Sequence, residues 1–119
     1  GQGEDPGPPP TGKDMWRTGG RPVYPKGSQH EGVTGQVDLL IHVTELGRIR
    51  TVEIITPSSD PRLDQVASRT VAETWTFQGA RRPYEVQVLV KFGRGQDARG
   101  DEVYDVDVEF IQLQYVTQE

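Results

Sequence analysis

The residue types that most often carry out catalysis are scarce in this chain. It has no cysteine, and its only histidines are His30 and His42. A zinc-type site would need both histidines together with a carboxylate such as Glu31 or Asp38, and their spacing does not bring them together. The phosphate-loop, G-x-S-x-G and H-E-x-x-H motifs are also missing. We therefore predict a protein that is not an enzyme, with no catalytic residue, no bound metal and no cofactor.

The acidic residues carry the more informative chemistry. Residues 97–119 hold seven acids and one base, a charge of −6, whereas residues 1–96 have a charge of +1. Asp105, Asp107 and Glu109 alternate with apolar residues and would project from one face of a strand at intervals of about 7 Å. Such a row suits a basic protein partner. The plainer interpretation is a solvated face that protects a sheet edge from aggregation.

Composition excludes several functional classes. The net charge of −5 argues against a nucleic-acid ligand, which requires a basic surface. No run approaches the roughly 20 apolar residues that cross a bilayer, and the first residues lack the features of a signal peptide. Residues 1–20 contain six glycines and four prolines, with Met15 and Trp16 as their only large apolar side chains. We therefore predict a flexible linker at 1–20, followed by one domain at 21–119.

Four strands and one helix must position these residues. Apolar residues alternate over 36–43, 84–92 and about 103–115, and less regularly over 48–56. The last segment changes phase after Phe110, from which we expect a β-bulge, a strong twist or a change of pairing partner. A helix is expected to start next, because Ser58, Ser59 and Asp60 are candidate N-caps and Pro61 suits the first helical position. Its apolar stripe ends near two aromatic residues that we expect in the core, Trp75 and Phe77. A polar connection is expected over 93–102.

The order of these elements predicts an α+β two-layer sandwich. A short hairpin makes the first two strands antiparallel, and the helix returns the chain across the sheet. The third strand then lies beside the first and the fourth pairs with the third, which gives the strand order 2-1-3-4. The expected fold is ββαβ(β), an antiparallel sheet of three to four strands packed on one main helix, with a short N-terminal helix near 26–31. We expect Leu63, Val66, Val71, Val86, Val88 and Phe92 to form the helix–sheet core.

An ordered series of short motifs resembles a known family. These motifs are Tyr24-Pro25, 32-GVTGQV-37, 46-LGRI-49, 57-PSS-59, 75-WTF-77 and 86-VQVLVKF-92. Together they resemble the TonB C-terminal domain over about residues 21–92. The resemblance implies a periplasmic domain, anchored to the inner membrane through an N-terminal segment absent from this chain. It also implies energy transduction from an inner-membrane motor of the ExbB–ExbD kind to an outer-membrane receptor or other envelope protein.

The resemblance also implies where a partner would bind. Family members add a strand to a short partner peptide, the TonB box, along the edge of the third strand, here Val86, Val88 and Val90. The segment before the first helix is tied to partner contact in the family. The matching positions here are Arg21, Pro22, Val23, Tyr24 and Pro25, and Arg21 replaces the usual Gln.

The acidic fourth strand departs from the family pattern and leaves alternatives open. It either occupies the third strand's edge as an integral part of the sheet or is displaced by a partner. We expect Asp105, Asp107 and Glu109 to belong to the surface of this domain that contacts the partner. The alternative function is an adaptor domain of an envelope-spanning motility or secretion machine, bound to a dedicated protein. A TolA-like domain and a strand-exchanged homodimer are further options.

Overall fold

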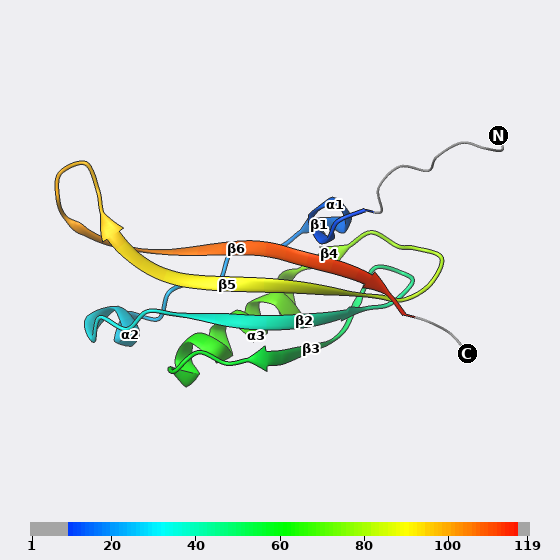
Figure 1. Ribbon diagram of the computed structural model, residues 1–119, viewed down its shortest axis with the longest axis horizontal. Helices are drawn as coiled ribbons and strands as arrows, with labels where there is room; N and C mark the ends of the chain where they lie inside the picture. Colours follow the sequence, from blue (N-terminus) through cyan, green and yellow to red (C-terminus); the bar gives the residue numbers. More distant parts are fainter. Residues whose placement is uncertain (1–9, 117–119) are drawn as a thin grey trace.

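The computed structural model describes residues 10–116 and contains six strands and three helices in that part of the chain (Figure 1). In chain order they are α1 Gly12–Met15, β1 Trp16–Thr18, α2 Lys26–His30, β2 Gly35–Val43, β3 Ile49–Thr56, α3 Pro61–Thr74, β4 Thr76–Phe77, β5 Tyr84–Gln96 and β6 Glu102–Tyr115.

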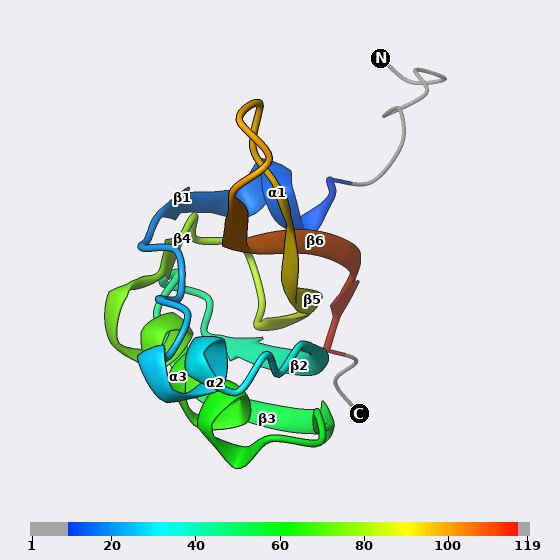
Figure 2. The ribbon, with the colours of Figure 1, turned by 90° about the vertical axis from the view of Figure 1, so that its left-hand side faces the viewer.

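A four-stranded antiparallel sheet forms one layer, in the order β3-β2-β5-β6. These strands correspond to the expected second, first, third and fourth strands. Helices α2 and α3 lie on one side of the sheet, and the other side is open (Figure 2). The α+β two-layer arrangement is therefore confirmed. β5 is an inner strand, while β3 and β6 form the two edges.

The core lies between α3 and the inner strands. Every second residue of β2 and β5 faces the helix, and the inward side chains from Val37 to Val43 and from Tyr84 to Phe92 are at most 2% exposed. On α3, Leu63 and Val71 are fully buried. Five of the six predicted core residues are buried, and Val66 packs against the core cluster while it stays partly exposed. It is partly buried because it lies on the flank of the helical stripe, beside a surface groove.

The predicted signals at the ends of α3 are confirmed. The Asp60 side chain caps the helix by accepting a hydrogen bond from the backbone N–H of Arg62, and Pro61 occupies the first turn. The helix ends at Trp75, and both Trp75 and Phe77 are buried. The pair forms a plug at the exit of the helix, as expected.

Three register shifts adjust the sheet where the apolar alternation is irregular. The β2–β3 ladder shifts register at two points, and the β5–β6 ladder shifts between Gln87 and Val88. In the second case Ile111 is the extra residue, since Phe110 and Gln112 pair with neighbouring positions. The bulge keeps both Phe110 and Leu113 against the core, and Ile111 is 43% exposed.

The polar connection predicted over 93–102 is wrong for most of its length. β5 continues to Gln96 and β6 begins at Glu102, which leaves only 97–101 as the turn. The glycines of β5 pair in the ladder, and Asp97 organises the turn by accepting hydrogen bonds from two backbone N–H groups. Because polar and glycine residues can pair when a hairpin holds them, the β5–β6 hairpin extends beyond the other strands (Figure 1).

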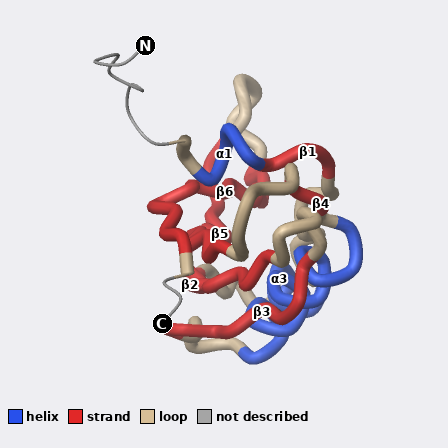
Figure 3. Tube along the Cα trace, turned by 90° about the vertical axis from the view of Figure 1, so that its right-hand side faces the viewer, coloured by secondary structure: helices blue, strands red, loops and turns tan. Residues whose placement is uncertain are grey.

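The flexible linker predicted for residues 1–20 is wrong over residues 12–18. α1 and β1 are ordered there, and β1 pairs with β4 in a separate two-stranded sheet on the same side of the main sheet as α3 (Figure 3). Trp16 supplies the missing apolar surface, with its ring centroid 5.7 Å from Trp75 and 6.4 Å from Phe110. Residues 1–9, the rest of the predicted linker, lie outside the described residues.

The β2–β3 turn gives the first testable prediction. Gly47 has φ 84°, and a Cβ atom there would lie 2.2 Å from the carbonyl oxygen of Phe77. Gly47→Ala should therefore lower the free energy of unfolding by about 2–3 kcal/mol, from left-handed strain and the clash with β4. Urea denaturation measures the effect.

Two other glycines separate the causes. Gly100 has the same φ with no atom near the Cβ position, and Gly95 has neither feature. Gly100→Ala should cost about 1 kcal/mol, and Gly95→Ala should be close to neutral. Equal losses at Gly47 and Gly100 would show that the contact with β4 contributes nothing.

A second prediction concerns β6, which lies against the core along its length. Val106 is 4% exposed, and Tyr104, Val108, Phe110 and Leu113 pack on the core cluster. Truncation after Gln96 would remove this cover and bare the edge of β5. The truncated chain should therefore lose cooperative thermal unfolding and aggregate. A sharp transition with a native-like circular dichroism spectrum would show instead that β6 is dispensable.

Candidate partner-binding site

The segment predicted to contact a partner, residues 21–25, runs from the β1–β4 sheet to α2. Its side chains alternate between buried and exposed. Pro22 and Tyr24 are buried, whereas Arg21 and Val23 are exposed, with Val23 at 73%. Pro25 is partly buried and lines a groove with Val23 on the outer side of α3. Two of the five side chains therefore belong to the packed interior, and the other three are at least partly exposed to solvent.

Tyr24 anchors this segment. Its hydroxyl donates a hydrogen bond to the carbonyl oxygen of Val33. Its ring meets Phe92 of β5 and Tyr104 of β6 edge to face, with centroids 5.3 and 5.1 Å apart. Burial raises the pKa of the Tyr24 hydroxyl above its ordinary value. A residue predicted as a contact is therefore a structural link between the N-terminal segment and both strands of the long hairpin.

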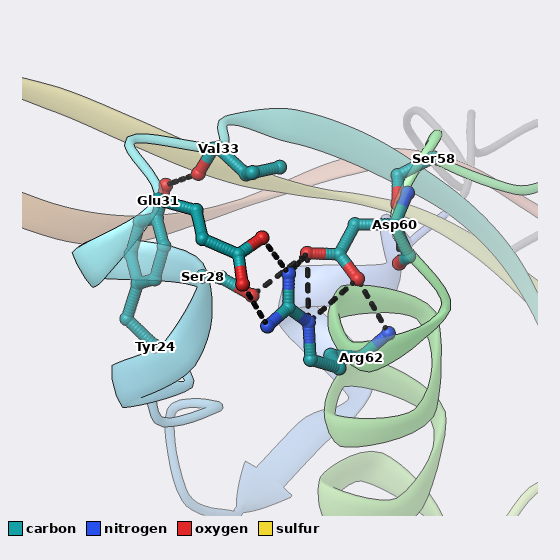
Figure 4. A network of polar contacts seen from close by, with 7 residues as sticks. All are labelled: Tyr24, Ser28, Glu31, Val33, Ser58, Asp60 and Arg62. Carbon is teal, nitrogen blue, oxygen red and sulfur yellow. Dashed lines mark hydrogen bonds and ion pairs between the residues drawn. The ribbon is translucent and has the colours of Figure 1, made fainter.

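A polar network next to Tyr24 fixes α2 against the start of α3 (Figure 4). Asp60 accepts hydrogen bonds from the Ser28 hydroxyl at 2.8 Å and from the Arg62 side chain at 3.0 Å. The same guanidinium reaches Glu31, with a nitrogen–oxygen distance of 2.8 Å. The Asp60 residue is only 6% exposed, and it is held ionised by these donors. Hydrogen bonding from Arg62 is the main reason that the pKa of Asp60 is lowered to about 2.

The predicted strand residues Val86, Val88 and Val90 do not form an accessible edge. All three are fully buried on the inner strand β5, which pairs with β2 on one side and with β6 on the other. A peptide cannot pair with β5 while β6 is in place. The edge that remains on this side of the sheet is the outer edge of β6 itself.

Asp105, Asp107 and Glu109 lie on the open side of β6, as the alternation predicted. The side chains of Asp105 and Glu109 are 79% and 51% exposed. Glu109 forms an ion pair with Lys91 of β5 at 2.6 Å, which is the main reason that the Lys91 pKa is raised. Asp107 has no ion pair among the residues the structure describes.

One contact joins two groups of predicted residues. The guanidinium of Arg21 lies 3.8 Å from the carboxylate of Asp105, and both side chains are well exposed. Val23 and Pro25, by contrast, lie beside α3 in a different groove. The structure therefore divides the predicted site and brings only Arg21 to the acidic strand.

Sequence reasoning missed a pocket beside β6. The pocket has a volume of about 280 Å³, and its lining includes Trp16, Trp75, Phe110, Gly20, Arg21 and Asp107. Gly19 lies so close to Trp75 that a Cβ atom would be 2.2 Å from the indole ring, and the Trp75 indole N–H donates to the carbonyl of Gly20. Met15 and Trp16, the only large apolar residues in a polar stretch, were the signal that this segment folds back.

The histidines offer no metal site among the residues that the structure describes. His42 lies on the open side of the sheet between Glu53 at 3.2 Å and Glu85 at 3.4 Å. Within residues 10–116, no group of three or more metal-binding side chains has metal-binding geometry. No helix in that range is long and apolar enough to cross a membrane. What the arrangement offers is an unpaired strand edge with an aromatic pocket beside it.

Comparison with known proteins gives one match. A family model described as "Gram-negative bacterial TonB protein C-terminal" matches residues 20–93. No curated protein and no solved structure matches. The matched region runs from just before the Tyr24 segment into β5. α1, β1 and β6 lie outside it, and residues of β1 and β6 line the aromatic pocket.

The Asp60 network predicts a specific acid sensitivity. The folded-state pKa of Asp60 is about 2, below its ordinary value of 3.8, so the network stabilises the fold above about pH 4. This stabilisation is lost as the pH falls from there through about 2. Asp60→Asn should therefore lower the free energy of unfolding by about 1–2 kcal/mol at pH 7, with the difference vanishing near pH 2.

Urea denaturation between pH 2 and 7 measures this difference. Asp105→Asn is the matched control, since it removes a carboxylate in a long and exposed ion pair, and it should change stability by less than about 0.5 kcal/mol. A deficit in Asp60→Asn that stays constant down to pH 2 would contradict the assigned ion pair.

Proposed function

Because the chain belongs to the family of Gram-negative bacterial TonB protein C-terminal domains, we propose that it couples inner-membrane proton-motive energy to an outer-membrane partner by β-strand addition. The family places it in the periplasm, as a domain that interacts with protein partners. The proposal assigns it no catalytic step. Its task is to hold an extended partner segment firmly enough for force or movement to be passed on.

The outer edge of β6 is the observation that carries this proposal. Strand addition needs a row of backbone N–H and C=O groups that no neighbouring strand has taken. β5 cannot supply such a row, because β6 covers it from Tyr84 to Gln96. β6 is the last strand on this side of the sheet. The partner segment would therefore pair with β6. That strand lies one position further out than β5, which carries the predicted residues Val86, Val88 and Val90.

The opposite edge, β3, is the competing location. Ile54 and Ile55 are 39% and 44% exposed there, so the edge is apolar as well as unpaired. Outside the sheet, α3 is the element that packs most closely against β3 in the described part of the chain. β6 has more to offer a specific partner, since an aromatic pocket, Arg21 and exposed carboxylates all lie beside it. We therefore place the binding edge at β6.

The remaining parts of the proposal lie outside this chain. An inner-membrane motor of the ExbB–ExbD kind would act through an N-terminal segment that precedes residue 1 and anchors the domain. A strand-exchanged homodimer is an alternative use of the same unpaired edges.

A second function, the adaptor of an envelope-spanning motility or secretion machine, is favoured by the acidic strand. In that function β6 would bind one dedicated protein, and the carboxylates of Asp105, Asp107 and Glu109 would contribute to recognition. In the energy-coupling function the backbone of β6 dominates, and changes to these side chains matter little. Charge dependence of partner binding therefore separates the two functions.

Cross-linking through single cysteines tests the location of binding. The chain has no native cysteine, so Asp107→Cys on β6 and Glu53→Cys on β3 each create a single reactive site. The probes are synthetic segments from the periplasmic ends of outer-membrane receptors, with cysteine placed at successive positions. We expect disulfides with Asp107→Cys at every second peptide position, because side chains alternate between the faces of an added strand.

Two controls sharpen this experiment. Peptides with N-methyl groups at alternate backbone positions cannot donate to the edge and should not cross-link. Glu53→Cys should give no more cross-linking than Glu45→Cys, in the exposed β2–β3 turn. Efficient trapping at Glu53→Cys alone would move the site to β3. Trapping at neither edge would overturn strand addition.

A further inference from the structure

We infer that the β6 edge selects an extended, basic segment, with Lys or Arg at alternate positions and an aromatic side chain between two of them. This inference rests on the proposed function, because it names the partner chemistry of the same edge. Three features near the middle of β6 support it: the aromatic pocket, the acidic row and the unfavourable charge of self-pairing.

The pocket defines the aromatic position. Its floor consists of Trp16, Trp75 and Phe110, whose ring centroids lie 5.7 to 6.4 Å apart. Its volume of about 280 Å³ accommodates one ring, and aromatic rings favour tilted or edge-to-face contact at such distances. Val108 and Phe110 also line the pocket, so it opens beside the edge on the helix side of β6. A side chain of an added strand opposite these residues would point the same way.

The acidic row defines the positions on either side. Asp105, Asp107 and Glu109 are exposed on the open side of the sheet, and Asp107 also borders the pocket at the edge of β6. Directly paired residues on an added strand would place their Cβ atoms about 5 Å from those of the acids. Opposite charges at such pairs stabilise a sheet, and like charges destabilise it. A partner with basic residues at every second position matches the row in either strand direction.

The basic side chains that already lie near the acidic row, Lys91 and Arg21, do not pair with all of its carboxylates. Lys91 lies on β5, on the inner side of β6, and pairs with Glu109. Arg21 reaches Asp105 only at 3.8 Å and remains 67% exposed. Asp107, between them, has no ion pair within the described range and lines the pocket. Asp107 is thus the carboxylate that a basic side chain on the added strand would neutralise.

The same charges disfavour a second copy of this chain as the occupant. Two β6 strands paired antiparallel about Asp107 would place Asp107 opposite Asp107 and Asp105 opposite Glu109. Like charges directly opposite one another destabilise a ladder, and charged side chains at an edge are a recognised protection against self-association. The same row of carboxylates therefore disfavours pairing between two copies of β6 and favours pairing with a basic strand.

Tryptophan fluorescence gives a direct readout, because both tryptophans of the chain line this pocket. The probe is a capped peptide containing Lys-Phe-Lys-Val-Lys, and its matched counterpart has Glu in place of each Lys. We expect the basic peptide to shift the emission and to bind at least tenfold more tightly than the acidic peptide at low salt. The advantage should shrink as salt screens the charges.

Variants assign the effect to β6. Asp105→Asn with Asp107→Asn should weaken binding of the basic peptide about fivefold. Glu45→Gln with Glu73→Gln makes the same charge change at exposed positions away from β6 and should leave it unchanged. Replacing the peptide Phe by Ala should weaken binding and remove the emission shift. Thermal unfolding of each variant establishes that the fold is intact.

The outcomes separate this inference from the proposed function. Cross-linking at Asp107→Cys cannot be combined with the charge variant at that position, so Val103→Cys, an exposed β6 residue, serves for mapping in the charge series. Equal binding of basic, neutral and acidic peptides, all trapped on β6, would overturn the inference and leave strand addition standing. An equal loss of basic-peptide binding in both double variants would show that the preference depends only on net charge. That result would also overturn the inference. Trapping of every peptide on β3 would overturn both.

Discussion

The architecture depends on β5 being paired on both sides. This strand shares a nine-residue ladder with β2 and a thirteen-residue ladder with β6, and its inward side chains form the centre of the core. The family region ends on β5 at residue 93, so the same strand joins the family-like part of the sheet to the added part. Because buried backbone groups must be paired, β6 is a structural requirement in this chain.

The N-terminal segment follows from that constraint. Once β6 is in place, Phe110 and Val108 need cover on the helix side, and Trp75 at the end of α3 supplies part of it. Trp16 and the chain around it also contribute to this cover, with β1 held by pairing to β4. Further along, Tyr24 contacts both hairpin strands, and the Asp60 network fixes the start of α3 against α2. The two parts outside the family match therefore stabilise one another.

Sequence patterns predicted the strands, the main helix and its caps, because alternation and capping are local signals. The bulge after Phe110 was also visible as a change of phase. The patterns failed where pairing overrides composition. The composition around Gly93 and Gly95 predicted a loop, but both residues pair with β6 across the hairpin. The composition of residues 12–18 predicted a linker, although Trp16 packs against Phe110. The pocket could not be predicted, since it joins residues from three distant segments. For the candidate site, exposure followed from the alternation of β6, whereas the burial of Tyr24 depended on partners far away in sequence.

An added strand moves the binding edge without changing how an edge binds. Main-chain hydrogen bonds supply affinity in strand addition, and the side chains beside the edge supply specificity. A chain that ended at β5 would present an edge flanked by Val86, Val88 and Val90 on the helix side. This chain presents one flanked by carboxylates on one face and by an aromatic pocket on the other. The extension by β6 therefore retains the mechanism of attachment and changes which extended segments can use it.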